Sequence, residues 1–410
     1  MTVTDGLDAR RSAPSNFGTF PQAERARPSS GQFEFALIAD RAQFAALEQE
    51  WNGLFARAGR PHQLFQAYDW LRHWANHYLD DRTRLSVVVA RQGGRLVMVW
   101  PLIAVRCAGL TRLCWMGEPV SQYGDVLVED GPARFYLLSQ GWAYVKSLGA
   151  DVIHFRKMRE DAAVFPLLRQ ASGRSIAVAA APYLNLASAA DYETYQRRYP
   201  AKRRARRRRL LARLEERGAV AFERHEYGSA AADLVTDALR LKHKWLIARG
   251  VVAPVLQDSR FDSFLRDVAA SEGTPAVRVS AVCCDGAAAA VEISLECKRH
   301  RVAYLISYDI ELAHYGVGII AAEDSIRTAH EAGLDRFDLL TPADAYKMEW
   351  ADASVEVHDW AMPLSFAGRI YARVWLELLK EWMKSSVKTW PAWLRRSAVA
   401  IYRRRQAPAG

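Results

Sequence analysis

The sequence predicts an α+β protein in which a mixed α/β fold occurs in two similar halves. A chain of 410 residues is longer than one average domain and suits two. Half of its residues are apolar, and 13 Trp, 16 Tyr and 15 Phe provide enough large side chains for two cores. A strand–turn–strand pattern occurs in both halves, at residues 85–105 and 276–297. Each half places helices before this pattern, and a crossover helix and a further strand after it.

The first half follows a leader, residues 1–32, whose Ser, Pro, Ala and Arg content predicts disorder. In the rest of this half, alternating or β-branched segments predict strands, and apolar stripes at helical spacing predict helices. Gly93 and Gly94 supply the hairpin turn. The expected strands are residues 33–37, 85–90, 96–105, 112–116, 125–128, 152–155 and 175–179. The expected helices are residues 41–58, 68–78, 134–148 and a short one around Leu167.

The second half opens near residue 186 with Ser188 and Asp191, which predict a capping box before a long helix or helix pair. This helical segment ends at Gly218. The further elements expected are strands at 220–223, 276–284, 288–297, 302–308 and 337–340, and helices at 231–249, 261–271 and 319–332. The predicted domains are a leader (1–32), a first domain (33–185), a second domain (186–363) and a basic helical tail (364–410).

The cysteines predict buried, reduced thiols in a cytoplasmic protein. Cys107, Cys114, Cys283, Cys284 and Cys297 form no CxxC pair and no Cys/His cluster with zinc spacing, so we expect no metal. Free Cys is usually buried, and neighbours on a strand, such as Cys283 and Cys284, point to opposite faces. No secretory signal and no apolar run long enough to span a bilayer is seen.

Much of the formal net charge of +10 sits in one run, residues 202–209. On a helix these arginines would cover every face. The run has three interpretations: nucleic-acid binding, contact with a phosphate or an anionic acceptor, and a solvated or membrane-facing helix. No aromatic interleaving or known module accompanies the run, which argues against nucleic acid. Because burying so many charges is costly, we expect this helix to be accessible near a groove between the halves.

The tail contains an apolar stripe at four-residue spacing, followed by two tryptophans and several arginines. The stripe consists of Phe366, Ile370, Val374, Leu378 and Trp382, and the tryptophans are Trp390 and Trp393. Packing on the second half is the commoner explanation of such a stripe, whereas Trp with Lys and Arg also suits a membrane interface. We expect residues 366–382 to pack on the protein and residues 390–405 to be free to touch membrane.

The stretch 304–350 carries the most informative pattern. A strand ending at Tyr308 and Asp309 precedes a loop with Gly316, Val317 and Gly318, and a helix begins at Ile319. Backbone N–H groups at the start of a helix bind phosphates, and small residues let the phosphate approach. The alternative is a loop whose glycines only provide positive φ. The strand–loop–helix–strand context improves the case for a phosphate site formed by residues 316–319.

Several motifs resemble the FemAB-like GNAT acetyltransferases, and most closely their cellulose-biosynthesis branch, the CelD/BcsL-type proteins. The C-terminal signature is carried by FDLL at 337–340, DAYK at 344–347 and Trp350. FQAYDW at 65–70, WPL at 100–102, the arginine-rich helix and the Tyr–Asp pair at 308–309 fit the same branch. The resemblance covers residues 35–362. It departs from the family at His314-Tyr315 and at Pro342-Ala343, both near the proposed site.

The resemblance implies two tandem GNAT-like folds, an acyl-CoA donor such as acetyl-CoA, and a part in extracellular polysaccharide production. In GNAT-type transfer a strand N–H polarises the donor carbonyl and the acceptor amine or hydroxyl attacks directly. By location, Asp309 is the candidate base and Tyr308 or Tyr346 the candidate acid. Lys347 is a candidate partner for a phosphate or an acidic acceptor. The alternatives are a core aromatic for Tyr346 and a structural ion pair for Lys347.

Three functions follow from these observations. The first is an acyltransferase acting on a polysaccharide precursor or a related carbohydrate acceptor. The second is a catalytically silent relative that binds a polysaccharide-synthesis assembly of the envelope through its basic surface. The third is a nucleic-acid-binding protein. For the first two we expect a cytoplasmic location, with contact to an inner-membrane polysaccharide synthase or to the membrane surface.

Overall fold

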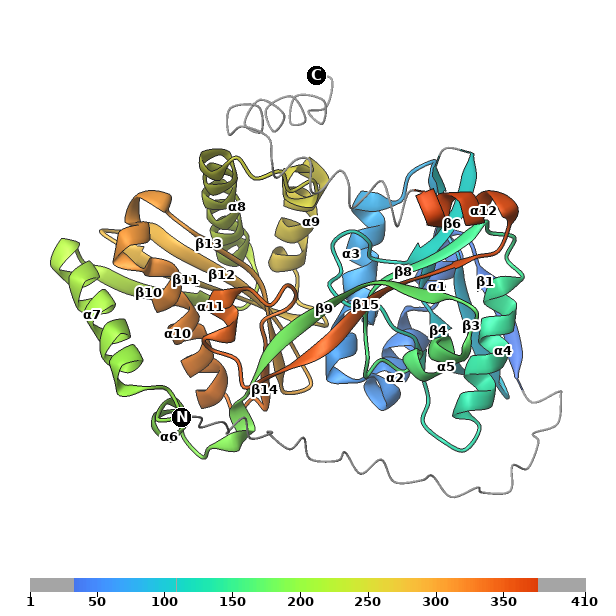
Figure 1. Cartoon of the computed structure of the whole chain (residues 1–410), viewed down its shortest axis with the longest axis horizontal. Coiled ribbons are helices and arrows are strands. Elements are labelled where there is room, and N and C mark those ends of the chain that lie inside the picture. The colour runs from blue at the N-terminus through green and yellow to red at the C-terminus, as the bar shows by residue number, and fades with distance from the viewer. Residues whose placement is uncertain (1–32, 108, 375–410) are drawn as a thin grey trace, which may run out of the picture.

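A long, twisted β-sheet runs through both halves of the computed structural model, which describes residues 33–107 and 109–374. Figure 1 shows helices packed around each end of this sheet and two long strands crossing between the ends. In order across the sheet, the strands are β10 (Val220–His225), β11 (Ala276–Cys284), β12 (Ala287–Cys297), β13 (His300–Tyr308), β14 (Arg336–Asp338), β9 (Arg174–Asn185), β15 (Ala353–Pro363), β8 (Val152–Arg159), β6 (Leu110–Trp115), β5 (Leu102–Cys107) and β2 (Thr83–Leu85).

A smaller sheet belongs to the first half alone. It consists of β1 (Glu34–Ile38), β3 (Val87–Gln92), β4 (Arg95–Trp100) and β7 (Leu127–Val128). The expected strand 96–105 is in fact two strands, because the chain turns at Pro101 and β4 and β5 pair in different sheets. Because proline has no N–H to donate to a neighbouring strand, the strand is interrupted at Pro101.

The helices lie around the two sheet ends. In the first half they are α1 (Arg41–Ala46), α2 (Glu48–Ala58), α3 (Tyr68–Tyr78), α4 (Arg134–Lys146), α5 (Phe165–Gln170) and the 3₁₀ segment η1 (Pro61–Gln66). In the second half they are α6 (Tyr192–Gln196), α7 (Ala201–Arg217), α8 (Ser229–Arg249), α9 (Ser259–Ala270), α10 (Val317–Glu331), α11 (Ala345–Met348) and the 3₁₀ segments η2 (Leu186–Ser188), η3 (Val255–Gln257) and η4 (Ile310–Tyr315). The last helix, α12 (Phe366–Tyr371), returns to the first-half end of the sheet, where Gly368 lies against the backbone of Asp151 (Figure 1).

The two halves share the same order of elements around one parallel strand pair. In the first half, β6 pairs in parallel with β8 after the crossover helix α4. In the second half, β13 pairs in parallel with β14 after the crossover helix α10. The other pairings of the long sheet are antiparallel, for example β11 with β12 and β9 with β15. The predicted similarity of the halves is therefore a property of the fold.

Strands from both sides of residue 186 hold the halves together. β9 precedes this position, yet it pairs with β14 and β15 of the following segment, and β15 in turn pairs with β8. An aromatic contact adds to this joint, because the Trp70 ring of α3 lies edge-on to Phe264 of α9, with centroids 4.9 Å apart. The domain boundary at 185/186 stays a prediction, and the chain on either side of it forms one sheet.

Several local expectations need correction. The helix expected at 41–58 is divided at Leu47 into α1 and α2. Ser188 lies in η2, and Asp191 caps α6 by accepting a hydrogen bond from the N–H of Thr194 at 2.7 Å. The strand expected at 175–179 extends over the whole of β9. Four of the five cysteines are buried free thiols as expected, whereas Cys107 is exposed.

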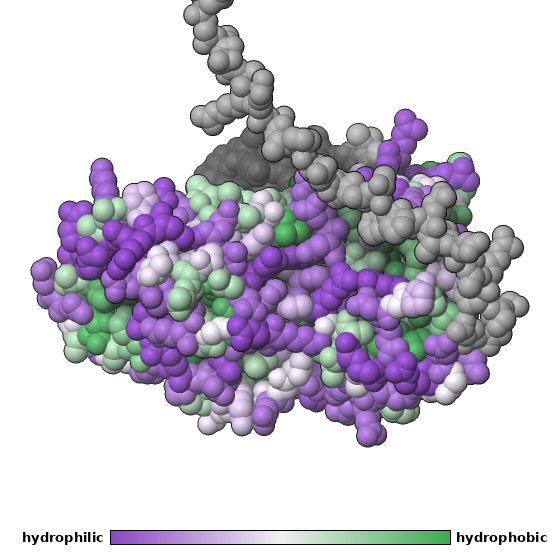
Figure 2. Space-filling model, turned by 90° about the horizontal axis from the view of Figure 1, so that it is seen from below, coloured by the Kyte–Doolittle hydropathy of each residue, from purple (hydrophilic) through white to green (hydrophobic). Residues whose placement is uncertain are grey.

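The tail prediction is wrong where the structure describes it. Phe366, Ile370 and Val374 are 74%, 51% and 48% exposed, so this part of the stripe does not pack on the second half. The leader (1–32) and residues 375–410, including Leu378, Trp382 and the later tryptophans, lie outside the described residues. The face seen from below is mostly hydrophilic, with smaller apolar areas, which is usual for a solvated surface (Figure 2).

Candidate active site

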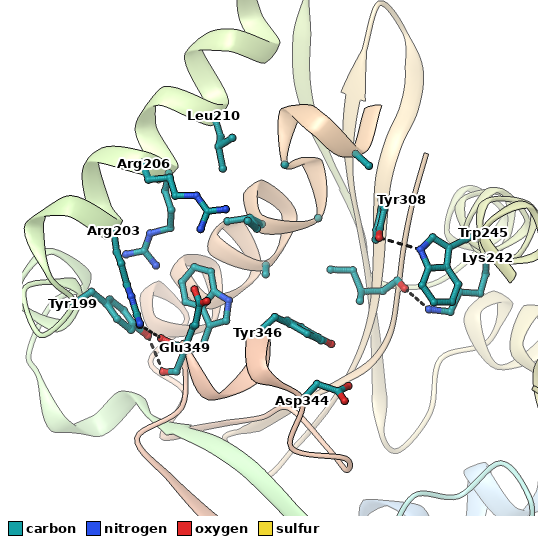
Figure 3. Close-up of a pocket in the computed structure, with 18 residues that line it drawn as sticks. Tyr199, Arg203, Arg206, Leu210, Lys242, Trp245, Tyr308, Asp344, Tyr346 and Glu349 are labelled. Atoms are coloured by element: carbon teal, nitrogen blue, oxygen red, sulfur yellow. Dashed lines mark hydrogen bonds between the residues drawn. The ribbon is translucent and has the colours of Figure 1, made fainter. Parts of the chain in front are cut away.

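A cavity of about 610 Å³ lies on the α10 side of the second half, between α7, α8, α11 and the end of β13 (Figure 3). Its position follows from the pairing of β13 and β14. These strands pair only from His300 to Val302 on β13, and beyond Val302 the β14-facing edge of β13 has no partner from that strand. The lining residues come entirely from residues 199–350. The arginine-rich helix therefore borders a cavity within the second half, and not a groove between the halves as predicted.

Cationic side chains from α7 and α8 line this cavity. Arg203, Arg206 and Lys242 all line it, and Figure 3 shows Arg206 directed from α7 toward its interior, whereas Arg203 runs beside Tyr199 toward Glu349. Arg203 also donates to the backbone oxygen of Glu349 at 3.1 Å. A cavity with several guanidinium and ammonium groups is suited to an anionic ligand such as a phosphate.

One arginine of the run contradicts the expectation of accessibility. Arg207 is 6% exposed, and its guanidinium lies 4.6 Å from the Tyr199 ring centroid and 4.4 Å from that of Trp350. Its Nε is 3.2 Å from an oxygen of Glu323. The aromatic faces and the carboxylate compensate the buried charge, so that Arg207 anchors α7 to α10 and to the segment that follows α11. The remaining basic residues at 202–209 are exposed or half-buried.

The predicted glycine loop lies at the wall of this cavity. Gly316 has φ of 71°, and a Cβ there would come 2.7 Å from Leu210, so both backbone and packing require glycine. Gly316, Gly318 and Ile319 line the cavity, whereas Val317 is buried beneath it. Because α10 begins at Val317, the N–H groups of its first turn form the positive end of the helix dipole. The N–H groups of Gly316 and Ile319 already donate to backbone oxygens, of Ala313 at 3.0 Å and of Gly316 at 2.8 Å. His314 and Tyr315, where the sequence departs from the family, are not among the lining residues.

Both predicted catalytic tyrosines line the cavity. The Tyr308 hydroxyl accepts a hydrogen bond from Nε1 of Trp245 at 3.0 Å. Tyr346 lies on α11 with about half of its surface open. The surrounding protein atoms and the carboxylate of Asp344 nevertheless raise the pKa of the Tyr346 hydroxyl to about 12. Both hydroxyls are therefore located to deliver a proton within the cavity, and Tyr346 keeps its own proton at neutral pH.

Asp309, the predicted base, is placed elsewhere. Its carboxylate caps η4 by accepting from the N–H of Glu311 at 2.9 Å and lies 3.5 Å from Nζ of Lys244. Asp309 is not among the residues that line the cavity. An Asx cap at a strand end is a common use of Asp. The structure therefore gives this carboxylate a structural role and removes the geometric reason for its selection as base.

A second cavity, of about 390 Å³, adjoins the first and reaches the first half of the chain. Lys242, Ile306 and Tyr346 line both cavities, which makes them neighbours at the divergence of β13 and β14. The walls of the second cavity also include Gln122 and Lys157 of the first half. We name the larger one the arginine cavity and the smaller one the inter-half cavity.

The backbone of Ile306 faces the junction of the two cavities. Nζ of Lys242 donates to the Ile306 oxygen at 3.0 Å, on the strand edge away from β12. In a strand the N–H and C=O of one residue point to the same side, so the Ile306 N–H points there too. This N–H is in a position to polarise a carbonyl oxygen at the junction.

A carboxylate from the middle of the sheet lines the inter-half cavity. Glu292 of β12 is buried, and its Oε1 accepts hydrogen bonds of 2.6 Å from the hydroxyls of Ser294 and Ser325. Burial raises the pKa of Glu292 above its ordinary value, and the two serine hydroxyls partly oppose this change. A buried carboxyl with a raised pKa in a cavity is typical of proton-transfer sites.

Lys347 also belongs to the inter-half cavity. Its ammonium is buried and donates to the backbone oxygen of Leu340 at 3.0 Å. Burial lowers the pKa of Lys347 below its ordinary value. The predicted role toward an acidic acceptor is thus compatible with its position, whereas the alternative salt bridge is replaced by a backbone contact.

The equivalent position in the first half is filled by aromatic rings. β6 and β8 pair at Arg112 and Leu113 only, but Trp115 then stacks on Phe155 with ring centroids 4.1 Å apart. A cavity of only about 10 Å³ adjoins this position. In the second half, the separation of β13 from β14 opens the arginine cavity. In the described part of residues 33–185, aromatic rings fill the place where β6 and β8 separate.

Metal clusters and membrane-spanning helices are both absent from the described residues. No group of three or more His, Cys, Asp or Glu side chains there could hold a metal ion. No helix there is both long and apolar enough to cross a membrane.

Comparison with known proteins gives the same picture for the second half. Residues 201–348 match the family model of the acetyltransferase (GNAT) domain, and this range contains most of the arginine cavity. No curated relative matches the chain in sequence. The match confirms the predicted enzyme class, a GNAT-type acyltransferase.

Solved structures extend the likeness over both halves. FemX aligns over 83% of this chain and 99% of its own, with 10% identity and a TM-score of 0.58. The C-terminal domain described as that of a lysylphosphatidylglycerol synthetase from Agrobacterium fabrum aligns over 80% and 95%, with 11% identity and a TM-score of 0.50. At such identities the likeness is one of fold, and it confirms the predicted mixed α/β, GNAT-like architecture.

Proposed function

We propose that this chain transfers an acyl group from acyl-CoA to a carbohydrate-related acceptor in exopolysaccharide or cellulose production. The donor is acetyl-CoA or a longer acyl-CoA. The polysaccharide role rests on the resemblance to CelD/BcsL-type proteins in the motifs at 337–340 and 344–347. The donor class rests on the matched GNAT domain and on the cavity beside it.

The observation that carries the proposal is the arginine cavity at the start of α10. Arg203, Arg206 and the first turn of α10 supply positive charge and N–H donors on its wall. The pyrophosphate of a coenzyme A donor is the kind of ligand that such a wall stabilises. Gly318 has no side chain, which keeps the space beside Tyr308 open. A Cβ at this position would lie 3.3 Å from the Tyr308 ring, closer than most Cβ contacts.

The chemistry then takes place at the junction with the inter-half cavity. The thioester carbonyl lies against the Ile306 N–H, and the acceptor amine or hydroxyl attacks its carbon from the side of the inter-half cavity. The new C–N or C–O bond forms, the C–S bond breaks, and the acceptor proton leaves to a base. Tyr308 or Tyr346 returns a proton to the departing thiolate.

The competing function is a silent relative that only binds a synthase assembly. A closed donor site would favour this function, and the side chains of His314 and Tyr315 are the ones expected to close it. The rings of these two residues contact each other in a tilted arrangement, with centroids 4.0 Å apart, and neither residue lines the open cavity. A nucleic-acid role is also less well supported, because Arg203 and Arg206 of the run line a cavity and Arg207 is buried.

We place the protein in the cytoplasm, with an inner-membrane polysaccharide synthase or the membrane surface as its neighbour. Calorimetry of the full chain with acetyl-CoA and longer acyl-CoA donors tests the central claim. Binding in the micromolar range, weaker for coenzyme A lacking its phosphates, is expected. Absence of binding at millimolar donor would exclude the transferase and leave the silent relative.

A further inference from the structure

The inter-half cavity contains three lysine ammonium groups that donate to neutral oxygens. Lys157 donates to the side-chain oxygen of Gln122 at 2.6 Å. Lys242 donates to the backbone oxygen of Ile306, and Lys347 to that of Leu340, each at 3.0 Å. Such bonds satisfy the donors without neutralising their charge. Carboxylates outside the lining offset part of it, Glu118 and Asp359 at Lys157 and Asp344 and Asp338 at Lys347. The lining itself still holds more positive than negative groups close to the reacting junction.

Glu292 is the carboxylate among the residues that line this cavity, and it cannot balance three ammonium groups. Its Oε1 accepts hydrogen bonds from Ser294 and Ser325, and burial raises its pKa, which makes it a stronger base than an exposed carboxylate. Burial lowers the pKa of both Lys242 and Lys347, and the nearby charge of Lys347 lowers the pKa of Lys242 further. A ligand with its own negative charge would relieve this cost.

Lys157 shows that the first half is built to contribute to this site. Its φ is 54°, a conformation that non-glycine residues rarely adopt. The strained backbone is held by a hydrogen bond of 2.9 Å from its N–H to Asp359 of β15, beside the irregular register between β15 and β8. Strain of this kind persists where surrounding structure fixes it, and it commonly aims a side chain at a functional site.

From these contacts we infer that the inter-half cavity is the acceptor site, that it selects an anionic carbohydrate through Lys157, Lys242 and Lys347, and that Glu292 takes the acceptor's proton. The inference rests on the proposed transferase function and adds the acceptor class to it. The acid group of the sugar, a carboxylate or a phosphate, lies among the ammonium groups. The attacking hydroxyl or amine lies toward Glu292 and the Ile306 N–H.

The charge of the acceptor is tested by binding, without turnover. Calorimetry of the full chain with glucose, glucuronate and glucose 1-phosphate compares a neutral sugar with the two sources of anionic charge. We expect one of the anionic sugars to bind at least about tenfold more tightly than glucose, in line with a charge-assisted hydrogen bond. Equal affinity for all three sugars, or no binding of any, would overturn the inference.

The assignment to Lys157 is tested by matched variants. Lys157→Met should remove the preference for the anionic sugar, whereas Lys157→Arg should keep it. Lys146→Met, on the exposed face of α4, is the control and should change nothing. A Lys157→Met protein that retains the full preference would show that the first half does not contribute. Retention of acetyl-CoA binding in each variant separates this failure from failure of the transferase proposal.

Glu292 is tested by turnover with acetyl-CoA and the preferred sugar, followed through release of free thiol. Glu292→Gln keeps an oxygen for the two serine hydroxyls and removes the base. Loss of about 100-fold or more in kcat is expected, with KM for both substrates little changed. The rise of kcat with pH that reflects deprotonation of Glu292 should be absent from Glu292→Gln. Full activity of Glu292→Gln, or no turnover of any sugar by the parent protein, would refute the assignment.

Discussion

Arg159 and Asp338 form an ion pair across the two halves, with Nη1 2.9 Å from Oδ2, and both side chains are almost completely buried. The hydroxyl of Tyr123 donates to the same carboxylate at 2.9 Å, and the backbone N–H of Leu340 donates to it at 2.8 Å. Asp338 ends β14, the strand whose divergence from β13 creates the proposed active site. The pair therefore fixes both the joint between the halves and the geometry of the site.

Removal of one partner should destabilise the protein strongly. Asp338→Ala leaves the buried Arg159 with Asp161 as its remaining carboxylate, and an incompletely paired buried charge costs about 3–5 kcal/mol of unfolding free energy. Urea denaturation followed by tryptophan fluorescence measures this loss. Asp130→Ala breaks the exposed pair with Arg134 and is the control, with an expected loss under about 1 kcal/mol. If both changes lower the unfolding free energy equally, the Arg159–Asp338 pair does not contribute specially to stability.

Local patterns explain what the sequence analysis predicted well. The elements from β11 to α10 follow from alternation, turn residues and apolar stripes, which neighbouring residues determine. The glycine loop could be located for the same reason, because Gly316 and Gly318 act through the backbone of their own segment. Tyr308 and Tyr346 were found through their distance from that loop along the chain and through the family motif.

Long-range relationships explain what was missed. Lys157 lies far in sequence from the stretch 304–350, in which the site was predicted. The pairing of its strand, β8, with β15 brings it to the inter-half cavity. Glu292 did carry a signal, since an acid in the apolar run of β12 is unusual, and it was overlooked. Asp309 was selected by sequence position alone, and the cap of η4 uses the carboxylate. The exposure of Phe366 could not be predicted from the sequence. An apolar stripe at helical spacing predicts burial, but it does not show which surface would cover the stripe.

The donor cavity makes a prediction for α7. Arg206→Met should raise the Kd for acetyl-CoA by about tenfold, because one charge-assisted contact to a phosphate is lost. Arg208→Met, on the same helix but outside the cavity lining, should have little effect. Calorimetry at two salt concentrations provides the measurement. If both variants bind the donor as the parent protein does, the phosphates do not contact α7.

The two glycines of the loop should respond differently to substitution. Gly318→Leu should abolish donor binding while the far-ultraviolet circular dichroism stays native, because Gly318 has ordinary φ and faces the cavity. Gly316→Ala should instead lower thermal stability, since its φ of 71° and the contact with Leu210 exclude a Cβ. Unchanged acetyl-CoA binding by Gly318→Leu would place the donor elsewhere.

The exposed apolar residues of α12 and the turn after it predict membrane contact. Replacing Phe366, Ile370 and Val374 together by Ser should reduce flotation of the full chain with vesicles containing anionic lipid, because an exposed apolar stripe inserts at the interface. Phe135→Ser removes another exposed apolar side chain, on α4, and should not. Equal flotation of the triple variant and the parent protein would remove the membrane contact.

The acceptor site should lose its preference for anions as pH rises. Burial, together with the adjacent Arg156, lowers the pKa of Lys157 to about 8. Lys157 is therefore charged below about pH 8 and neutral above it, so that KM for the anionic sugar should rise between pH 7 and 9 while KM for acetyl-CoA changes less. In Lys157→Arg the charge persists, because a guanidinium stays protonated, and the rise should disappear over this range. Steady-state kinetics of the two proteins at several pH values give the comparison. The same pH dependence in both would mean that another group titrates, and that Lys157 does not hold the anion.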